Sequence, residues 1–177
     1  MAKIPELHKS TAPKSVGIYI ITCSTSKFKE LKASKKPNDT SGDLIETIAQ
    51  AAGHRIEGRQ LISDSKPMIT KTTKHALRAP RVNAIIITGG TGLSPRDVTP
   101  ESIMPLVERA IPGFGELFRK ISFETIGSPA LLSRAFAGTS NGKAIFCLPG
   151  SPDAVQTAME KLILPELGHI IGVAHEH

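Results

Sequence analysis

The sequence predicts an α/β protein, a three-layer αβα sandwich built around a mainly parallel sheet. Three observations support this fold class. Apolar, β-branched runs alternate along the chain with stretches of helical periodicity, an order that favours parallel strands covered by helices on both faces. Several of these runs end in polar or glycine-rich loops. The length of 177 residues suits one domain with a sizeable core.

The first part of the chain is expected to hold two strands with a helix between them. Residues 16–22 form a continuous β-branched run, which indicates a strand buried on both faces, and a lysine-rich loop follows. A helix begins at 40–43 with capping residues, carries apolar residues at helical spacing and ends at Gly53. Residues 54–63 form a second, more polar strand that ends at Asp64.

The rest of the chain is expected to repeat this alternation. A second helix spans about 67–79, and 81–88 is the third strand. Three further helical segments are expected at about 100–110, near 114–123 and within 127–137. A tight turn at 139–143 leads into the fourth core strand, 144–148, and a closing helix ends the domain.

Residues 1–15 are expected to form a polar N-terminal arm, and 16–177 a single domain. The N-terminus lacks the apolar segment of a signal peptide, and no run approaches the roughly 18 apolar residues of a membrane helix. We therefore expect a cytoplasmic protein without membrane contact. Cys23 and Cys147 lie in apolar strand-like runs and are expected to be buried thiols without a disulfide.

The formal net charge of +6 raises the possibility of a nucleic-acid partner. The composition of no Trp, one Tyr and six Phe argues against a base-stacking platform, and no helix-turn-helix or zinc-finger spacing occurs. We therefore expect no nucleic-acid partner. The densest basic run is either a solvated loop or an aid in attracting a phosphorylated ligand; it comprises Lys27, Lys29, Lys32, Lys35 and Lys36.

A glycine-rich loop at 88–101 (TGGTGLSPRDVTPE) follows the apolar run 84–87. Its glycines allow close approach of backbone to a ligand, and 99–101 are expected to supply an N-cap, a first-turn proline and an acidic residue. Strand, glycine loop and helix N-terminus in this order can hold a phosphate. Asp97 within the loop suits a metal or a reacting group, while Arg96 either pairs with a phosphate or orients Asp97.

Common nucleotide and catalytic motifs are missing from the chain. Neither a Walker A sequence, nor a G-x-G-x-x-G fingerprint, nor a G-x-S-x-G elbow occurs. The histidines show no H-x-x-x-H spacing, and His175 and His177 are expected to belong to a frayed end. Asp64 and the loops 89–97 and 149–152 each follow a strand, so they are expected to converge on one rim of the sheet.

Four motifs in order, GGTGLSPRDVTPE, PGFGELFR, GSPALLSRAFAG and LPGSP, closely resemble the MoaB/MogA family of molybdenum cofactor biosynthesis proteins. The stretches TSGDLIETIAQAAGH and LISD match the early part of the same family, so the resemblance covers about residues 16–170. It implies the molybdopterin-binding fold, and the short length indicates the free-standing branch. Two positions depart from the family pattern: Thr25 stands where many relatives carry an aspartate, and Pro129 where a small hydroxyl residue is common.

The resemblance implies that the chain binds molybdopterin, a pterin dithiolene with a terminal phosphate. It also implies Mg²⁺-dependent adenylylation of molybdopterin by ATP, or alternatively a catalytically inactive molybdopterin-binding protein. Asp64 and Asp97 would be the functional carboxylates and the Mg²⁺ ligands, a fit with the preference of this ion for a few carboxylates plus phosphate oxygens. The ligand would be cradled by Ser24, Gly89, Gly90, Thr91, Gly92, Ser128, Gly150, Ser151 and Pro152.

The resemblance further implies a homo-oligomer, either a trimer or a hexamer built from two trimers. It also allows transient contacts with other proteins of the molybdenum cofactor pathway. Use of molybdenum and use of tungsten both remain open.

Overall fold

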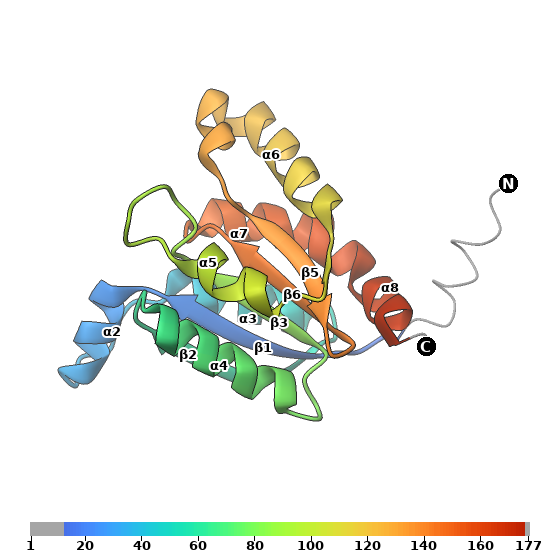
Figure 1. Ribbon diagram of the computed structural model, residues 1–177, viewed down its shortest axis with the longest axis horizontal. Coiled ribbons are helices and arrows are strands. Elements are labelled where there is room, and N and C mark those ends of the chain that lie inside the picture. The colour runs from blue at the N-terminus through green and yellow to red at the C-terminus, as the bar shows by residue number, and fades with distance from the viewer. Residues whose placement is uncertain (1–12, 176–177) are drawn as a thin grey trace, which may run out of the picture.

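The computed structural model describes residues 13–175 and contains a six-stranded sheet in the order β2-β1-β3-β6-β5-β4 (Figure 1). The first four strands of that order are mutually parallel, while β5 and β4 at the other edge pair antiparallel. The strands are β1 (Gly17–Cys23), β2 (Arg55–Ile62), β3 (Ala84–Thr88), β4 (Arg109–Ala110), β5 (Phe136–Ser140) and β6 (Lys143–Leu148).

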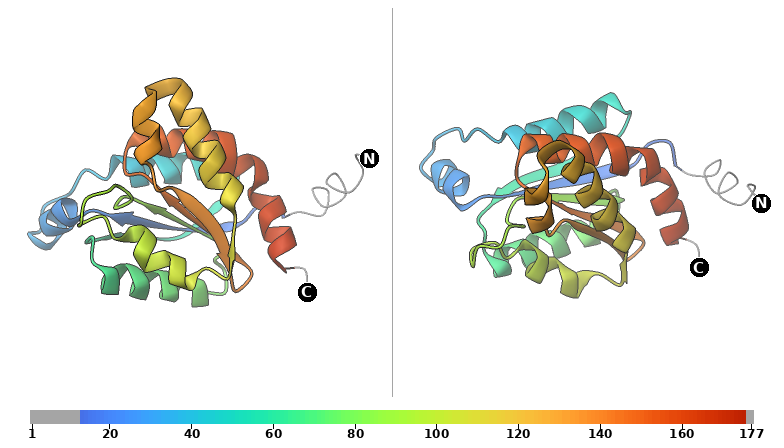
Figure 2. Two further views of the ribbon diagram at one scale, coloured as in Figure 1. Left: turned by 45° about the horizontal axis from the view of Figure 1, so that its top comes forward. Right: turned by 90° about the horizontal axis from the view of Figure 1, so that it is seen from above.

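Helices cover both faces of this sheet, which confirms the predicted three-layer arrangement (Figures 1 and 2). One face carries α3 (Thr40–Ala51), α6 (Pro112–Ile126), α7 (Pro152–Ala158), a π-helical turn (Met159–Ile163) and α8 (Leu164–His175). The other face carries α4 (Lys66–Arg78) and α5 (Thr99–Ile103). Two 3₁₀ turns, η1 (Met104–Leu106) and η2 (Ser128–Leu132), and the short helix α2 (Thr25–Lys32) complete the elements.

The core divides into two apolar layers, one on each side of the sheet. In β1, Ile18 and Ile20 belong to the layer beneath α3 and α7, while Tyr19 and Ile21 belong to the layer beneath α4. Successive side chains of a strand point to opposite faces, so a strand covered on both sides must be apolar throughout. The burial predicted for the β-branched run at 16–22 is therefore confirmed.

Three expected elements differ from the structure. Lys27, Lys29 and Lys32 of the lysine-rich stretch lie in helix α2 rather than in a loop, because Lys and Glu favour helix and Lys32 lies over the Phe28 ring; Lys35 and Lys36 follow the helix, in the expected loop. The helix expected at 100–110 ends at Ile103, and its last residues form β4 instead.

The third difference concerns 127–137, where the expected helical turns reach only as far as η2 and strand β5 begins at Phe136. The sequence of β5, FAGTS, lacks a β-branched run because small residues are needed there. A Cβ at Gly138 would lie 2.4 Å from the Val107 side chain, so no larger residue fits this position.

Several smaller expectations can be compared with the same structure. Cys23 and Cys147 are buried free thiols, as predicted. The cap of α3 is Asp39, one residue before the expected start, and His175 belongs to α8. His177 and most of the expected arm at 1–15 lie outside the described residues. Within 13–175, no helix is long and apolar enough to span a membrane.

Candidate functional site

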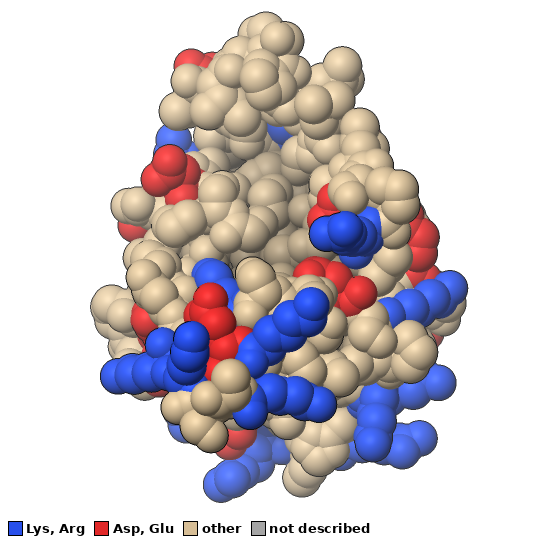
Figure 3. Space-filling model, turned by 90° about the vertical axis from the view of Figure 1, so that its left-hand side faces the viewer, with Lys and Arg blue, Asp and Glu red and all other residues tan. Residues whose placement is uncertain are grey.

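A cleft of about 650 Å³ opens at the edge of the sheet where β1, β3 and β6 end. Figure 3 looks onto this face and shows a hollow lined mainly by uncharged residues, with charged side chains around its rim. The carboxyl ends of parallel strands are the usual ligand-binding edge of such sheets. The predicted site residues that line the cleft are Ser24, Asp64, Gly89, Gly90, Thr91, Gly92, Asp97, Gly150 and Ser151.

The glycine loop lies directly against both predicted carboxylates. Gly90 has a φ of +65°, and a Cβ there would stand 2.5 Å from Thr99 Oγ1 and 3.0 Å from Asp64 Oδ1. A Cβ on Gly92 would stand 2.8 Å from Asp97 Oδ2. Since real Cβ atoms do not approach oxygen this closely, glycine at both positions allows two carboxylates to flank one backbone segment.

The neck of this loop is closed by Thr99, which is fully buried. Its hydroxyl donates to the carbonyl of Gly89 (2.8 Å), and its amide donates to the carbonyl of Gly90 (3.0 Å). Thr99 is the first residue of α5 rather than the predicted N-cap, which is Val98. The hydrogen bonds of this threonine therefore join the loop at the end of β3 to the start of α5.

Asp64 is held on one side only. Its Oδ2 accepts hydrogen bonds from the amide and the hydroxyl of Thr25, at 2.7 and 2.9 Å. Thr25, the residue that departs from the family pattern, thus joins the start of α2 to this carboxylate. Oδ1 of Asp64 accepts no hydrogen bond from residues 13–175 and faces Gly90, so it is available to a ligand.

Asp97 is held within its own turn. Its Oδ2 accepts from the amide of Ser94 (3.0 Å), and its amide donates to the carbonyl of Ser94 (2.8 Å). Asp97 Oδ1 has no hydrogen-bond partner in the described part of the chain. Both carboxylates line the same cleft, and among residues 13–175 each has one oxygen that accepts no hydrogen bond.

The loop after β6 forms the next wall of the cleft. Its backbone carbonyls are held by two hydroxyls: Thr88 donates to Pro149 (2.8 Å) and Ser41 donates to Gly150 (2.7 Å). Ser151 caps α7 by accepting from the amide of Ala154 (3.4 Å). Pro152 begins this helix and does not line the cleft.

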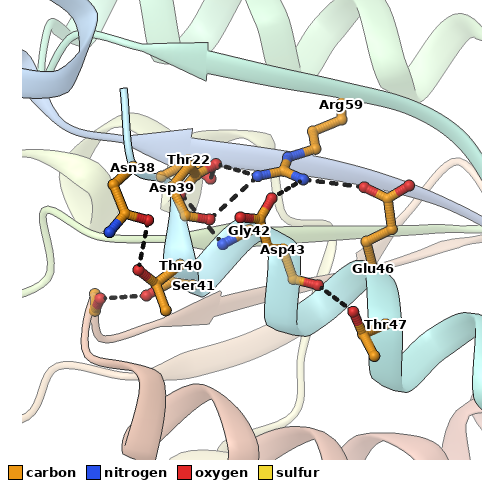
Figure 4. A network of polar contacts seen from close by, with 11 residues as sticks. Thr22, Asn38, Asp39, Thr40, Ser41, Gly42, Asp43, Glu46, Thr47 and Arg59 are labelled. Atoms are coloured by element: carbon orange, nitrogen blue, oxygen red, sulfur yellow. Dashed lines mark hydrogen bonds and ion pairs between the residues drawn. The ribbon is translucent and has the colours of Figure 1, made fainter. Parts of the chain in front are cut away.

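A network of charged residues supports the cleft from behind (Figure 4). Asp39 Oδ2 accepts from the hydroxyl of Thr22, a cleft residue, at 2.9 Å, and from Arg59 Nη2 at 2.7 Å. Arg59 also pairs with Asp43 and Glu46 of α3. Burial lowers the pKa of Arg59, but these hydrogen bonds outweigh burial and raise the pKa overall, so its charge persists.

The wall of the cleft formed by α6 and η2 is mainly apolar. It is lined by Phe118, Ile126, Pro129, Ala130 and Leu132, with the hydroxyls of Ser122 and Ser133 among them. The predicted Ser128 is exposed and does not line the cleft. Apolar walls with a few placed polar groups are typical of small-molecule sites.

Arg96 lies outside this cleft. It borders a neighbouring hollow together with Ser26, Lys29 and the shared residues Ser24 and Asp64. Its side chain makes no hydrogen bond to Asp97, and its amide donates to Ser94 Oγ at 3.3 Å. Of the two alternatives open from the sequence, orientation of Asp97 by the Arg96 side chain is therefore not observed.

The donor set fits a magnesium ion that is bound mainly through its substrate. Within residues 13–175, no three His, Cys, Asp or Glu side chains gather as a metal cage. Mg²⁺ is usually bound by one or two carboxylates together with phosphate oxygens and water, which matches Asp64 and Asp97. Burial raises the pKa of the adjacent Cys23 thiol to about 12, so this side chain is a neutral thiol at neutral pH.

Three residues around the site were not identified from the sequence. Arg134 reaches the glycine loop from the segment before β5, and Asp39 and Arg59 join α3 to β1 and β2. Arg134 lies within the quoted GSPALLSRAFAG motif, so the motif was a usable signal. Asp39 and Arg59 lie outside the stretches that carry the family resemblance.

Comparisons with known proteins identify the family of this chain. A family model described as "Probable molybdopterin binding domain" matches residues 19–169. The chain is 43% identical over 169 residues to "Molybdenum cofactor biosynthesis protein B" of Bacillus cereus, covering 95% of this chain and 96% of that protein. It is 39% identical over 163 residues to the "Probable molybdopterin adenylyltransferase" of Methanocaldococcus jannaschii, covering 92% and 96%.

Among solved structures, the fold resembles the tungsten cofactor synthesizing protein MoaB from Pyrococcus furiosus, with a TM-score of 0.82 and 34% identity. That comparison covers 93% of this chain and 100% of the other. A crystal structure of molybdenum cofactor biosynthesis protein B gives a TM-score of 0.86 at 41% identity, over 94% of this chain and 100% of that one. The chain therefore belongs to the MoaB/MogA family and carries its molybdopterin-binding domain.

Proposed function

We propose that this protein is a molybdopterin adenylyltransferase of molybdenum cofactor biosynthesis, which uses ATP and Mg²⁺. The observation that carries this proposal is the position of two carboxylates, Asp64 and Asp97, against one glycine loop at the mouth of a single cleft. The family and the name of the Methanocaldococcus jannaschii relative support the same activity.

The reaction requires one bond to form and one to break. An oxygen of the terminal phosphate of molybdopterin attacks the α-phosphorus of ATP, and the bond to the β-phosphate oxygen breaks, releasing pyrophosphate. Such a transfer needs positioning and neutralisation of phosphate charge more than covalent help from the protein. Asp64 and Asp97 would hold Mg²⁺, which supplies charge neutralisation when bound.

The remaining cleft residues fit the two ends of molybdopterin. The apolar wall of α6 and η2 offers a surface for the pterin. Thr91 of the glycine loop and Ser151 of the 149–152 loop line the part of the cleft where a phosphate would lie. Lys27 also lines the cleft and adds a positive charge that attracts an anionic ligand. One cleft thus combines an apolar part and a phosphate-binding part.

The test is to incubate the purified protein with molybdopterin and Mg-ATP and to measure pyrophosphate and adenylylated molybdopterin. Asp97→Asn is expected to retain molybdopterin binding and to lose turnover, because an amide binds Mg²⁺ poorly. Asp153→Asn is the matched control, since Asp153 is exposed beside the same rim without lining the cleft. Normal turnover in Asp97→Asn would refute the role given to Asp97.

The second candidate is a protein that binds molybdopterin without converting it. It is favoured if molybdopterin binds with micromolar or better affinity and no pyrophosphate forms with any divalent metal. In that case Asp97→Asn would have no activity to lose and the enzyme proposal would be abandoned.

We further propose that the protein acts in the cytoplasm as a homotrimer or a hexamer of two trimers, with transient contacts to other proteins of the pathway. Family resemblance supports the assembly. Light scattering on the purified protein tests it directly, and a monomer at working concentration would refute it.

A further inference from the structure

Arg134 lies across the glycine loop, although it comes from the segment before β5 and does not line the cleft. Its Nη2 donates to the carbonyl of Asp97 (2.7 Å), and its Nε donates to the carbonyl of Thr91 (3.4 Å). These carbonyls stand at the two ends of the segment 91–97. One planar guanidinium therefore ties both ends of this segment together.

Arg134 is itself held at two places, its guanidinium and the backbone on either side of it. Its Nη1 pairs with the carboxylate of Glu101 on α5, and this hydrogen bond lowers the pKa of Glu101 against a smaller opposing effect of burial. Arg119 donates to the carbonyls of Ser133 (3.3 Å) and Ala135 (3.4 Å), the neighbours of Arg134 on either side. Both the backbone and the side chain of Arg134 are thus held in place.

Within the part of the chain that the structure describes, no side chain other than Arg134 donates a hydrogen bond to segment 91–97 from outside it. Residues 93–96 are exposed, and the bonds between Ser94 and Asp97 lie within the turn itself. Among residues 13–175, the hydrogen bonds that join this segment to the rest of the protein come from Arg134. The local turn therefore sets Asp97 relative to Ser94, whereas Arg134 sets the whole turn relative to the sheet.

We propose that Arg134 is a positioning residue, which holds the carboxylate of Asp97 at the cleft without touching substrate, and that Glu101 orients its guanidinium. This role rests on the proposed function, in which Asp97 acts on the phosphates. A displacement of about 1 Å at a reacting centre can lower a rate on the order of 100-fold. Loss of Arg134 is therefore expected to slow turnover rather than to weaken molybdopterin binding.

Two variants and one control test this role by steady-state kinetics. Arg134→Ala and Arg134→Lys are expected to lower kcat about tenfold or more and to change KM for molybdopterin less than about twofold. Lysine keeps the positive charge but lacks the fork that spans two carbonyls and a carboxylate, so it separates geometry from charge. Arg55→Lys is the matched control, because Arg55 also pairs with a carboxylate, that of Glu57, but lies at the start of β2 and does not line the cleft; it is expected to keep kcat within about twofold of wild type.

Guanidinium ion added to Arg134→Ala is expected to restore part of kcat, an effect that general destabilisation would not give. An unchanged kcat, a rise in KM alone, or an equal loss of kcat in Arg55→Lys would overturn the proposal. Arg134→Lys keeps the test decisive if the alanine variant folds poorly.

Amide hydrogen exchange on the ligand-free protein separates this role from the proposed function. The amides of Ser94 and Asp97 are expected to exchange about tenfold faster in Arg134→Ala than in wild type or Arg55→Lys. If wild type shows no turnover with molybdopterin and Mg-ATP, the proposed function fails, and exchange alone decides whether Arg134 holds the loop. Equal exchange in all three proteins would overturn the role of Arg134 whatever the activity.

Discussion

Substitution of Gly90 by alanine should destabilise the protein through two separable effects. Its φ of +65° lies in the left-handed region, where a Cβ costs about 1–2 kcal/mol. The new Cβ would also stand 2.5 Å from Thr99 Oγ1. Thr99 is fully buried, so its hydroxyl cannot move aside without losing its bond to the Gly89 carbonyl.

Gly53 provides the matched control for this substitution. Its φ is +84°, and a Cβ there would meet nothing within 4 Å. Gly53→Ala should therefore show the conformational cost alone, partly offset by the reduced entropy of the unfolded chain, or about 1 kcal/mol in total. Gly90→Ala should lose in addition the buried hydrogen bond of Thr99, about 1–3 kcal/mol.

The assay is urea unfolding of both variants and wild type, with the free energy of unfolding taken by linear extrapolation. Gly90→Ala is expected to be about 1–3 kcal/mol less stable than Gly53→Ala. It should also lose turnover, because Asp64 Oδ1 lies 3.0 Å from the new Cβ. If the two variants were equally stable, the close packing of Thr99 against the glycine loop would be refuted.

Three further predictions concern the support of the site and its titrating groups. Asp39→Ala should lower the free energy of unfolding, measured in urea, by about 2–4 kcal/mol, because it removes the α3 cap and leaves the buried Thr22 hydroxyl unpaired. Asp43→Ala is the control: its side chain is 64% exposed, so its loss should cost less than about 1 kcal/mol. The thiols of Cys23 and Cys147 should not react with a disulfide reagent at pH 8 in the native protein, since burial raises the pKa of Cys23 to about 12 and that of Cys147 well above its ordinary value. Both thiols should react in denaturant, and rapid labelling of the native protein would contradict their burial. Burial, aided by Arg55, lowers the pKa of His54, whose Nδ1 accepts from the Val16 amide (3.4 Å). As the pH falls below about 6.5, His54 therefore binds a proton in the unfolded chain before it does so in the folded protein, and the free energy of unfolding should decline. His54→Gln should show a smaller decline in the free energy of unfolding between pH 7 and 5.5.

The strands of the sheet centre followed from local pattern. Continuous β-branched runs at 16–22 and 84–87 can be buried only as strands covered on both faces, and both runs are fully buried. The two antiparallel strands β4 and β5 could not be predicted in this way. The small residues of β5 make sense only beside α6 and the Val107 side chain, which pack on this strand from elsewhere in the chain.

The same division holds for the candidate site. The glycine loop and Asp97 form one contiguous stretch, so their chemistry is visible in the order of residues, and parallel topology then implies that Asp64 and the 149–152 loop lie at the same rim. The structure places Asp64, Asp97, Gly150 and Ser151 along one cleft, whereas Ser128 and Pro152 do not line it.

The amino-acid order thus specified the fold class, the family and the loop that carries the chemistry, because each depends on neighbouring residues or on strand order. The hydrogen bonds of Arg134 to that loop, and those of Arg59 behind the cleft, follow only from the tertiary structure. Arg134 is 37 positions from Asp97 in sequence, and Arg59 is 20 from Asp39, yet each lies within 2.7 Å of its partner. Contacts of this kind depend on how loops and helices pack around the sheet, which no local spacing of residue types records.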